Sequence, residues 1–401
     1  MRQTITVVGA LILFLAFALP GCAEDPTSVG AGVLPIGDLP VYSIDTLDAS
    51  SMNAQRATVL TTRSDGTVFN WVPTTLFLGN VQSLRSGVFV KFHQIPDSLE
   101  GGTVTGADLL LYTRSFVGDS SATVAFTIHR GLTSWTGDSL TYDSLEVVDR
   151  YFSSSATPPG IGAGSTDSGA VVIPLDTAMV TAWLVSTIDT GNVNQGVYLN
   201  PSSATVIRGY YSFLGSSVFQ PHLRVRYLKD GVSRTYVHGT GVSRYIASLP
   251  PADLPQNSVQ AGVAYRSIQT YNISALSRLA SVNDARLELT LDSAASLLTG
   301  FGADSLYAFL VQDNGSISLA SRALSTPSYI NGRRTYSLAL NSIVQTWLHQ
   351  VQATLAIAAF SENSSMDRFV FFGPADSIGL RPRLIVTYSE ARLVAPNGGG
   401  Q

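Results

Sequence analysis

Cysteine is nearly absent from this sequence: Cys22 is the only one in 401 residues. A mature chain that begins at Cys22 has no second thiol, so disulfide bonds are excluded and stability must come from a buried core. Charge is also scarce, because Asp, Glu, Lys and Arg make up 13% of the chain and the net charge is −4. This composition gives no case for nucleic-acid binding, which requires clustered Lys and Arg. The sequence therefore indicates a protein held together by apolar packing, with hydroxyl side chains instead of charged ones covering its exposed faces.

Long hydrophobic runs are missing as well. The run from residue 5 to residue 19 is shorter than the roughly 20 apolar residues that span a bilayer, but with Arg2 before it, it has the form of a signal peptide. The segment Leu19-Pro20-Gly21-Cys22 resembles a bacterial lipobox. We therefore expect a signal peptide over residues 1–21, lipidation of Cys22, and a tether over residues 22–39. A lipid anchor makes the membrane a partner and places the chain at the outer membrane or cell surface.

The mature part of the chain is longer than one ordinary domain, and it contains an internal repeat. Three pairs of segments match in the same order: 104–111 with 282–289, 179–184 with 343–348, and 221–227 with 382–388. We expect a first domain over residues 40–229, a second over 230–390, and a disordered tail over 391–401.

Each repeated segment has a characteristic period. In the closing segment, Leu223, Val225 and Tyr227 alternate with His222, Arg224 and Arg226, which indicates a strand with one face on a core and the other in water. The Trp segments instead have helical spacing, with the apolar stripes Met179, Val180, Trp183, Leu184 and Ile343, Val344, Trp347, Leu348. We expect one short helix in each copy with a buried indole. The expected N-caps are Thr177 or Asp176 in the first helix and Asn341 in the second.

Other segments are typical of strands and turns. Asp313-Asn314-Gly315 between two apolar runs predicts a hairpin. The stretch 153–169, which contains Pro158-Pro159-Gly160, is expected to be a long loop. Lys229-Asp230-Gly231 is expected to end the first copy. The sequence as a whole predicts an all-β protein made of two tandem jelly-roll β-sandwich domains, each with one short helix.

The order of these segments resembles the DNRLRE-type modules of secreted bacterial proteins, which are similar to jelly-roll carbohydrate-binding modules. The resemblance is carried by residues 76–79, by Arg85 with 88–92, by 107–111, and by the segments around Trp135, Trp183 and 221–227. The second copy keeps 266–271, 285–289, Trp347, 354–360 and 382–388, but it lacks an equivalent of Trp135. What the resemblance implies is a fold, an extracellular setting and a non-catalytic role.

Motifs for chemistry are few, and we assign no catalytic residue and no cofactor. Asp138, Asp143 and Glu146 could form a carboxylate pair of the kind that glycosidases use, but such residues are also ordinary turn formers. The five histidines show no metal-ligand spacing, and no nucleophile elbow is present. A structural calcium ion is left open, with Asp304, Asp313 and Asp367 as candidate ligands.

Four aromatic residues are least explained by core periodicity, and they are the candidates for ligand binding: Trp71, Trp135, Tyr210 and Tyr211. Sugar binding uses exposed aromatic faces with polar neighbours. The alternative for Tyr210-Tyr211 is a strand pair with one ring buried, and we favour that alternative. The leading functional hypothesis is adhesion or binding of a polysaccharide at the cell envelope. The second hypothesis is a structural or assembly component that holds a surface protein at the outer membrane.

Overall fold

The computed structural model describes most of the chain in segments. These are residues 41–47, 49–56, 73–82, 84–92, 95, 99, 101–136, 151–161, 166–167, 169–185, 194–203, 205–248, 255, 257–263, 265–299, 304–362 and 364–390. Several residues and ranges for which the sequence makes predictions lie outside this description: 1–21, Cys22 with its tether, Trp71, Asp138, Asp143, Glu146 and the tail 391–401.

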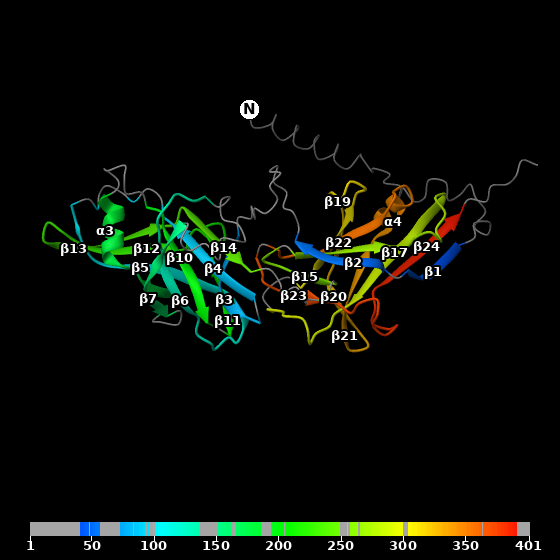
Figure 1. Ribbon diagram of the computed structural model, residues 1–401, viewed down its shortest axis with the longest axis horizontal. Helices are drawn as coiled ribbons and strands as arrows, with labels where there is room; N and C mark the ends of the chain where they lie inside the picture. The colour runs from blue at the N-terminus through cyan, green and yellow to red at the C-terminus, as the bar shows by residue number, and fades with distance from the viewer. Residues whose placement is uncertain are drawn as a thin grey trace, which may run out of the picture.

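Antiparallel strands dominate the described chain, and their pairing divides them into two groups, here called the first and second lobes (Figure 1). The first lobe contains β3 (Thr75–Val81), β4 (Leu84–Lys91), β5 (Thr103–Gly118), β6 (Ala125–Gly131), β7 (Phe152–Ile161), β8 (Thr166–Asp167), β9 (Ala170–Pro174), α3 (Thr177–Val185), β10 (Val197–Ser203), β11 (Val206–Tyr211), β12 (His222–Lys229), β13 (Val232–Gly239) and β14 (Val242–Ala247). The second lobe contains β1 (Val41–Leu47), β2 (Ala49–Arg56), β15 (Ser258–Gln260), β16 (Tyr265–Tyr271), β17 (Ala280–Thr290), β18 (Leu306–Val311), β19 (Ile317–Ser325), β20 (Pro327–Ile330), β21 (Arg333–Ala339), α4 (Asn341–Trp347), β22 (Ala353–Ala359), β23 (Arg368–Val370) and β24 (Arg383–Glu390). The all-β sandwich predicted from the sequence is confirmed.

In the first lobe, one long strand connects the two layers. The first part of β5 pairs with β12 and β9, and its last part pairs with β11, so the strand passes from one layer to the other. The core between the layers takes Leu109, Leu223 and Ile173 from one side, and Leu78, Val90, Ile128 and Leu199 from the other. Tyr227 completes the buried face of β12, whose alternation follows the predicted pattern.

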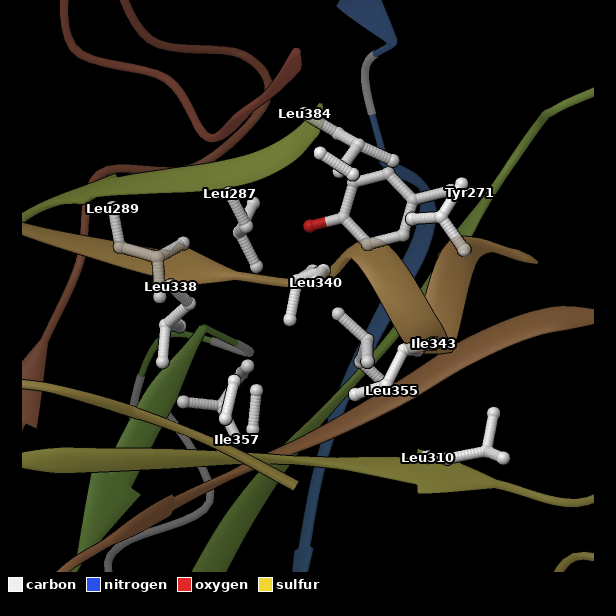
Figure 2. Packing of buried hydrophobic residues seen from close by; sticks show 14 of the residues in the cluster. Tyr271, Leu287, Leu289, Leu310, Leu338, Leu340, Ile343, Leu355, Ile357 and Leu384 are labelled. Carbon is white, nitrogen blue, oxygen red and sulfur yellow. The ribbon is translucent and has the colours of Figure 1, made fainter. Parts of the chain in front are cut away.

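The second lobe repeats this arrangement with its own core. Strands β1, β24, β17, β21 and β20 form one layer, and the sheet containing β18, β22 and β16 forms the other. Figure 2 shows side chains from the two layers meeting between them, including Leu287, Leu289, Leu338, Leu384, Leu310, Leu355 and Ile357. The β18–β19 hairpin turns at Gly315, as predicted, with a φ of 80° that glycine adopts readily.

Both helices bury the predicted stripe, but their caps differ. In α3 the carboxylate of Asp176 accepts hydrogen bonds from the backbone N–H groups of Ala178 (2.7 Å) and Met179 (3.2 Å), so Asp176 is the N-cap. In α4 the prediction of Asn341 as N-cap is wrong, because the helix starts after Leu340 without a side-chain cap. The Asn341 amide instead accepts from the N–H of Ala285 in β17, at 3.0 Å, and ties the helix to the sheet.

Parts of the predicted 153–169 loop are strands, so that prediction is wrong over residues 153–161, in β7, and over residues 166–167, in β8. Strand β7 pairs with the edge of β6, with two register shifts. Pro158 and Pro159 fall at the shift between the pairs Phe126↔Gly160 and Ile128↔Thr157. Proline is tolerated in edge strands and bulges because no ladder hydrogen bond is lost there.

The strand pairing does not follow the boundary predicted at residues 229 and 230. Strands β13 and β14 lie in the range expected for the second domain, yet they pair with β12 and β4 of the first lobe. Strands β1 and β2 lie in the range expected for the first, yet they pair with β24 and β16. Asp230 and Gly231 have positive φ angles (54° and 72°), and this two-residue turn sends the chain back along β12 instead of out of the lobe.

The lobes meet at a buried apolar junction. Phe77, Leu84 and Ile207 of the first lobe pack in one cluster with Val263 and Met366 of the second. At the edge of this cluster the Tyr245 hydroxyl donates to the carbonyl of Gly262 at 2.9 Å. In the part of the chain that the structure describes, no helix has the length and hydropathy to cross a membrane.

Candidate functional site

The two adjacent tyrosines at the end of β11 have opposite environments. Tyr210 is buried in the first-lobe core, and burial raises the pKa of its phenol far above the ordinary value. Tyr211 is half-buried and lies at the surface. The favoured prediction, a strand pair with one ring buried, is therefore confirmed, and of the two rings Tyr211 is the one that a ligand can reach.

Trp135 is buried, with 2% of its surface exposed, and it belongs to an aromatic cluster with Phe89, Phe152 and Tyr198. Its indole N–H donates to the carbonyl oxygen of Gln195 at 2.7 Å. Both faces of this indole are therefore occupied by protein packing, and Trp135 supplies no open platform in this structure.

Tyr211 belongs instead to a connected group of surface rings, which we call the aromatic face: Tyr112, Tyr211, Phe219 and His222. The ring centroids of Tyr211 and Phe219 lie 5.4 Å apart, and those of Phe219 and Tyr112 are also 5.4 Å apart. The His222 ring lies 6.0 Å from that of Tyr112. The guanidinium of Arg114 lies 5.3 Å from the centre of the Tyr211 ring, in a cation–π contact.

The turn between β11 and β12 holds Phe219 in this position. Ser212 is buried, and its hydroxyl oxygen accepts from the N–H groups of Leu214 (3.2 Å) and Gly215 (3.1 Å). The Ser216 hydroxyl accepts from the N–H groups of Val218 (3.2 Å) and Phe219 (3.1 Å). These local bonds fix a turn whose large apolar side chains are between 41% and 67% exposed: Phe213, Leu214, Val218 and Phe219.

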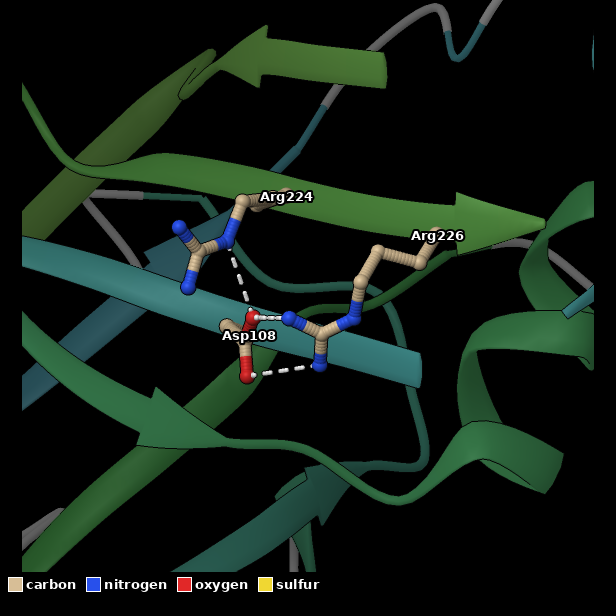
Figure 3. Close-up of polar contacts among 3 residues, drawn as sticks. All are labelled: Asp108, Arg224 and Arg226. Carbon is tan, nitrogen blue, oxygen red and sulfur yellow. Dashed lines mark hydrogen bonds and ion pairs between the residues drawn. The ribbon is translucent and has the colours of Figure 1, made fainter. Parts of the chain in front are cut away.

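A charged cluster continues the same surface along β12, because His222, Arg224 and Arg226 alternate with the buried residues of that strand. Figure 3 shows two guanidinium groups meeting the carboxylate of Asp108 on β5. Arg224 Nε and Arg226 Nη1 each lie 2.9 Å from Asp108 Oδ2, and Arg226 Nη2 is 3.4 Å from Oδ1. Gly106 leaves room for this, since a Cβ at that position would lie 2.6 Å from Arg226 Nη2. Two positive groups on one negative group leave a net positive charge beside the aromatic face.

His222 lies between the rings and the charges. Burial lowers the pKa of its imidazole, a backbone hydrogen bond at Gln220 opposes that shift, and the nearby His238 adds to it. A pKa below the ordinary value of about 6.5 keeps the ring neutral at pH 7. Because Nδ1 of His222 is buried, the ring nitrogen left for a ligand at that pH is Nε2, which can form a hydrogen bond without adding charge.

The three candidate calcium ligands do not form one cluster, although Asp304 lies close enough to Asp367 to contribute, after burial, to the raised pKa of its carboxyl. Asp304 forms an ion pair with Arg334, and the Asp313 carboxylate accepts from the N–H of Val351 at 3.0 Å. Asp367 is buried and bonded to Ser365, and burial raises the pKa of its carboxyl. Within the described segments, no three His, Cys, Asp or Glu side chains are placed to hold a metal ion.

The second lobe has a groove lined by arginines on the layer formed by β17, β21 and β24, which corresponds to the layer of β5 and β12 in the first lobe. A groove of about 420 Å³ is lined by residues of β17, β21 and β24 and of the segment before β24, among them Arg333, Arg381, Arg383 and Glu288. Arg383 Nη1 lies 3.9 Å from Glu288 Oε2. Sequence reasoning missed this groove, although the outward positions of all three strands could have been found from their alternation. The groove has no ring cluster comparable to the aromatic face, so it provides charge without a stacking surface.

The aromatic face and its charged cluster can bind a ligand by stacking and hydrogen bonding. Of the four ring candidates, the structure brings Tyr211 into this site and places Tyr210 and Trp135 in cores, while Trp71 lies outside the described residues. Tyr112, Phe219 and His222 were not predicted as site residues, because they come from separate strands and turns. Comparisons of the chain with models of known protein families, with curated proteins and with solved structures give no match.

Proposed function

We propose that this chain is a non-catalytic lipoprotein of the cell envelope, anchored through Cys22, that binds a polysaccharide through the aromatic face of its first lobe. The observation that carries this proposal is the grouping of Tyr112, Tyr211, Phe219 and His222 on one outward surface beside Arg224 and Arg226. The resemblance of the sequence to modules that are similar to carbohydrate-binding jelly rolls supports the same conclusion.

The chemistry of the surface favours sugars that carry acidic groups. Exposed rings stack on the apolar face of a pyranose, and neighbouring polar groups bond its hydroxyls. The two guanidiniums exceed the single carboxylate of Asp108, and arginine binds carboxylate or sulfate through two parallel N–H groups. A glycan with carboxylate or sulfate groups therefore matches both the aromatic face and the charged cluster beside it.

A binding role fits this surface better than hydrolysis. A glycosidase requires two carboxyl groups facing each other across the scissile bond. The carboxylate in the described part of this site, Asp108, is 4% exposed and engaged by two arginines. It has neither the partner nor the exposure that acid–base chemistry on a sugar requires, so we assign the site to recognition.

Removal of exposed rings is expected to weaken glycan binding. Tyr211→Ala and Phe219→Ala should each reduce the affinity for an acidic polysaccharide about tenfold, because a lost aromatic contact costs on the order of 1 kcal/mol. The measurement is a glycan array on residues 23–401, followed by titration with the best-bound polysaccharide. Tyr329→Ala is the matched control, since this tyrosine is 74% exposed in the second lobe, away from the aromatic face. Equal affinities for all four proteins would remove the aromatic face from the proposal.

Loss of the thiol is expected to release the protein from the membrane. Cys22→Ala should abolish incorporation of labelled palmitate and move the protein from the membrane fraction, because this is the only residue in the chain that a lipoprotein pathway can acylate. Gly21→Ala is the control, since it keeps a small residue before the cysteine. Undiminished labelling of Cys22→Ala would contradict the proposed anchor.

The exposed turn favours a second candidate function, the assembly role. Phe213, Leu214 and Val218 are exposed within one short turn, and exposed apolar side chains that lie together mark protein interfaces. In that case Leu214→Ser together with Val218→Ser should abolish cross-linking to a partner protein in cells, while binding to every polysaccharide stays undetectable at millimolar ligand.

A further inference from the structure

The two lobes carry the same accessory pair of strands, and the pairs match in register. In the first lobe, β13 pairs with β12 and β14 with β4, whereas in the second lobe β1 pairs with β24 and β2 with β16. Arg226 and Thr387 occupy the same position in the repeated closing strand, and their partners are Thr235 and Ser43. The other half of each pair agrees as well, because Ser86 lies opposite Ala247 and Ser267 lies opposite Ala54.

The spacing within the pairs is also nearly the same. Ala54 follows Ser43 by 11 residues, and Ala247 follows Thr235 by 12. The segment β1–β2 is therefore the counterpart of β13–β14. The repeated unit consists of an accessory pair followed by a lobe: β1–β2 precedes β3–β12, and β13–β14 precedes β15–β24.

Each pair nevertheless completes the lobe that it does not precede. The two-residue turn at Asp230 and Gly231 fixes β13 on β12, so the first lobe is completed by the segment that follows it directly. The matching edges of the second lobe, on β24 and β16, are filled by β1–β2 from the far end of the sequence (Figure 1). Tyr42 and its partner Tyr388 are separated by 346 positions in the chain.

This long separation has a consequence for association. The backbone groups of β24 and β16 that β1–β2 covers are an open sheet edge whenever the pair is absent, and an open edge accepts any strand of suitable pattern. A second copy of the chain presents the same edges. The local turn prevents exchange of β13, whereas β1–β2 is joined to β3 through residues 57–74.

We propose that β1–β2 of one copy pairs with β24 and β16 of a second copy, so that the chain forms strand-exchanged oligomers. Reciprocal exchange between two copies gives a closed dimer, and one-way exchange gives a linear array. The same strands pair with the same sheet edges in the monomer and in the exchanged oligomer. The ratio of oligomer to monomer therefore depends on the protein concentration relative to the effective concentration of β1–β2 held near its own β24 and β16 by the chain.

Single cysteines at register partners test this exchange. Two variants of the full-length chain are prepared, both carrying Cys22→Ser: one also carries Ser43→Cys and the other Thr387→Cys. The two variants are unfolded, mixed, refolded in mild detergent and then oxidised. A disulfide between the two chains forms only where β1 of one copy lies on β24 of the other. With an effective concentration of about 1 mM for the tethered pair, about a tenth of the chains at 100 µM should be exchanged; in an equal mixture about half of these, roughly one chain in twenty, should form the disulfide-linked heterodimer, and the fraction should rise with concentration.

The matched control is the equivalent pair in the first lobe, Thr235→Cys mixed with Arg226→Cys, which the tight turn keeps within one chain. We expect at least tenfold less heterodimer there. A β1–β24 mixture that gives no more heterodimer than this control overturns the proposal. The same holds if Ser43→Cys and Thr387→Cys, combined in one chain at 1 µM or below, fail to form an internal disulfide, because the exchange requires that pairing.

Discussion

Glu362→Ala is expected to lower the free energy of unfolding by about 3–5 kcal/mol, because it leaves the charge of Arg266 buried without its partner. The pair is bidentate: Arg266 Nε and Nη2 each donate to a carboxylate oxygen of Glu362 at 2.7 Å. Both side chains are 8% exposed, and the guanidinium also lies 5.7 Å from the centre of the Phe309 ring. Few sites in the described chain combine so much burial with full charge.

The effect should extend to the junction between the lobes. The backbone carbonyl of Glu362 accepts from the N–H of Gly262 at 2.8 Å, and the carbonyl of Gly262 accepts from the hydroxyl of Tyr245. Burial, and secondarily the charge of Glu362, raises the pKa of that phenol well above its ordinary range. Denaturant unfolding of the variant should therefore lose cooperativity between the lobes as well as stability.

Two controls distinguish burial from simple charge removal. Asp284→Ala breaks the exposed pair with Arg286, whose side chains are 45% and 52% exposed, and should cost less than about 1 kcal/mol. The double variant Arg266→Met with Glu362→Leu removes both charges and should recover most of the stability. A loss in Glu362→Ala no larger than in Asp284→Ala would show that the pair is hydrated.

Trp347→Ala is expected to lower the free energy of unfolding by about 3–5 kcal/mol, because it removes a buried side chain from the core of the second lobe and leaves a cavity. The indole is 1% exposed and stacks on Tyr271, with 5.8 Å between ring centroids. Thermal unfolding followed by circular dichroism measures the effect. An unchanged midpoint would contradict the placement of this ring in the core.

Phenylalanine substitutions test the polar contribution of the two buried indoles. Within the described structure, Trp347 Nε1 has no hydrogen-bond partner, so Trp347→Phe should cost only about 1–2 kcal/mol, mostly from the smaller volume. Trp135→Phe also removes the donor to the Gln195 carbonyl and leaves that oxygen unsatisfied, which adds roughly 1–3 kcal/mol. The Trp135 variant should therefore be the less stable of the two.

Local periodicity was sufficient to predict the elements that bury one face. The alternation in residues 222–227 and the helical spacing around Trp183 and Trp347 each describe a single segment against a core, and both predictions are confirmed. The same reasoning failed at β7. Its prolines favour a loop, but a strand at a sheet edge with a bulge also accommodates proline, and β7 pairs with β6 in that way. This reasoning also failed at Asn341, whose side-chain oxygen accepts a hydrogen bond from Ala285 on β17, 56 positions away, which no local pattern reveals.

The candidate site was harder to predict for the same reason. Tyr211 could be selected from its neighbours in sequence, but Tyr112 lies about 100 positions earlier, and the two rings are linked only through Phe219 in the turn after β11. Trp135 is a candidate in the sequence because core periodicity does not account for it, and the partners that bury it, Phe89 and Tyr198, come from distant strands. Pairings across long separations decide which rings stay at the surface.

The attachment of β1 to β24 also determines how tension would pass through an anchored molecule. Strand β1 begins at Val41 beside the end of β24, at the pole farthest from the first lobe in Figure 1. If the chain is anchored through Cys22 and binds its ligand on the aromatic face, as proposed, a pull between the membrane and the ligand loads the β1–β24 and β2–β16 ladders first. If those ladders separate, residues 41–74 can extend to a length on the order of 100 Å, at about 3.5 Å per residue. The chain stays covalently continuous from β1 to the first lobe, so in the anchored state proposed above we expect loss and re-formation of this pairing to let the molecule lengthen and shorten under tension.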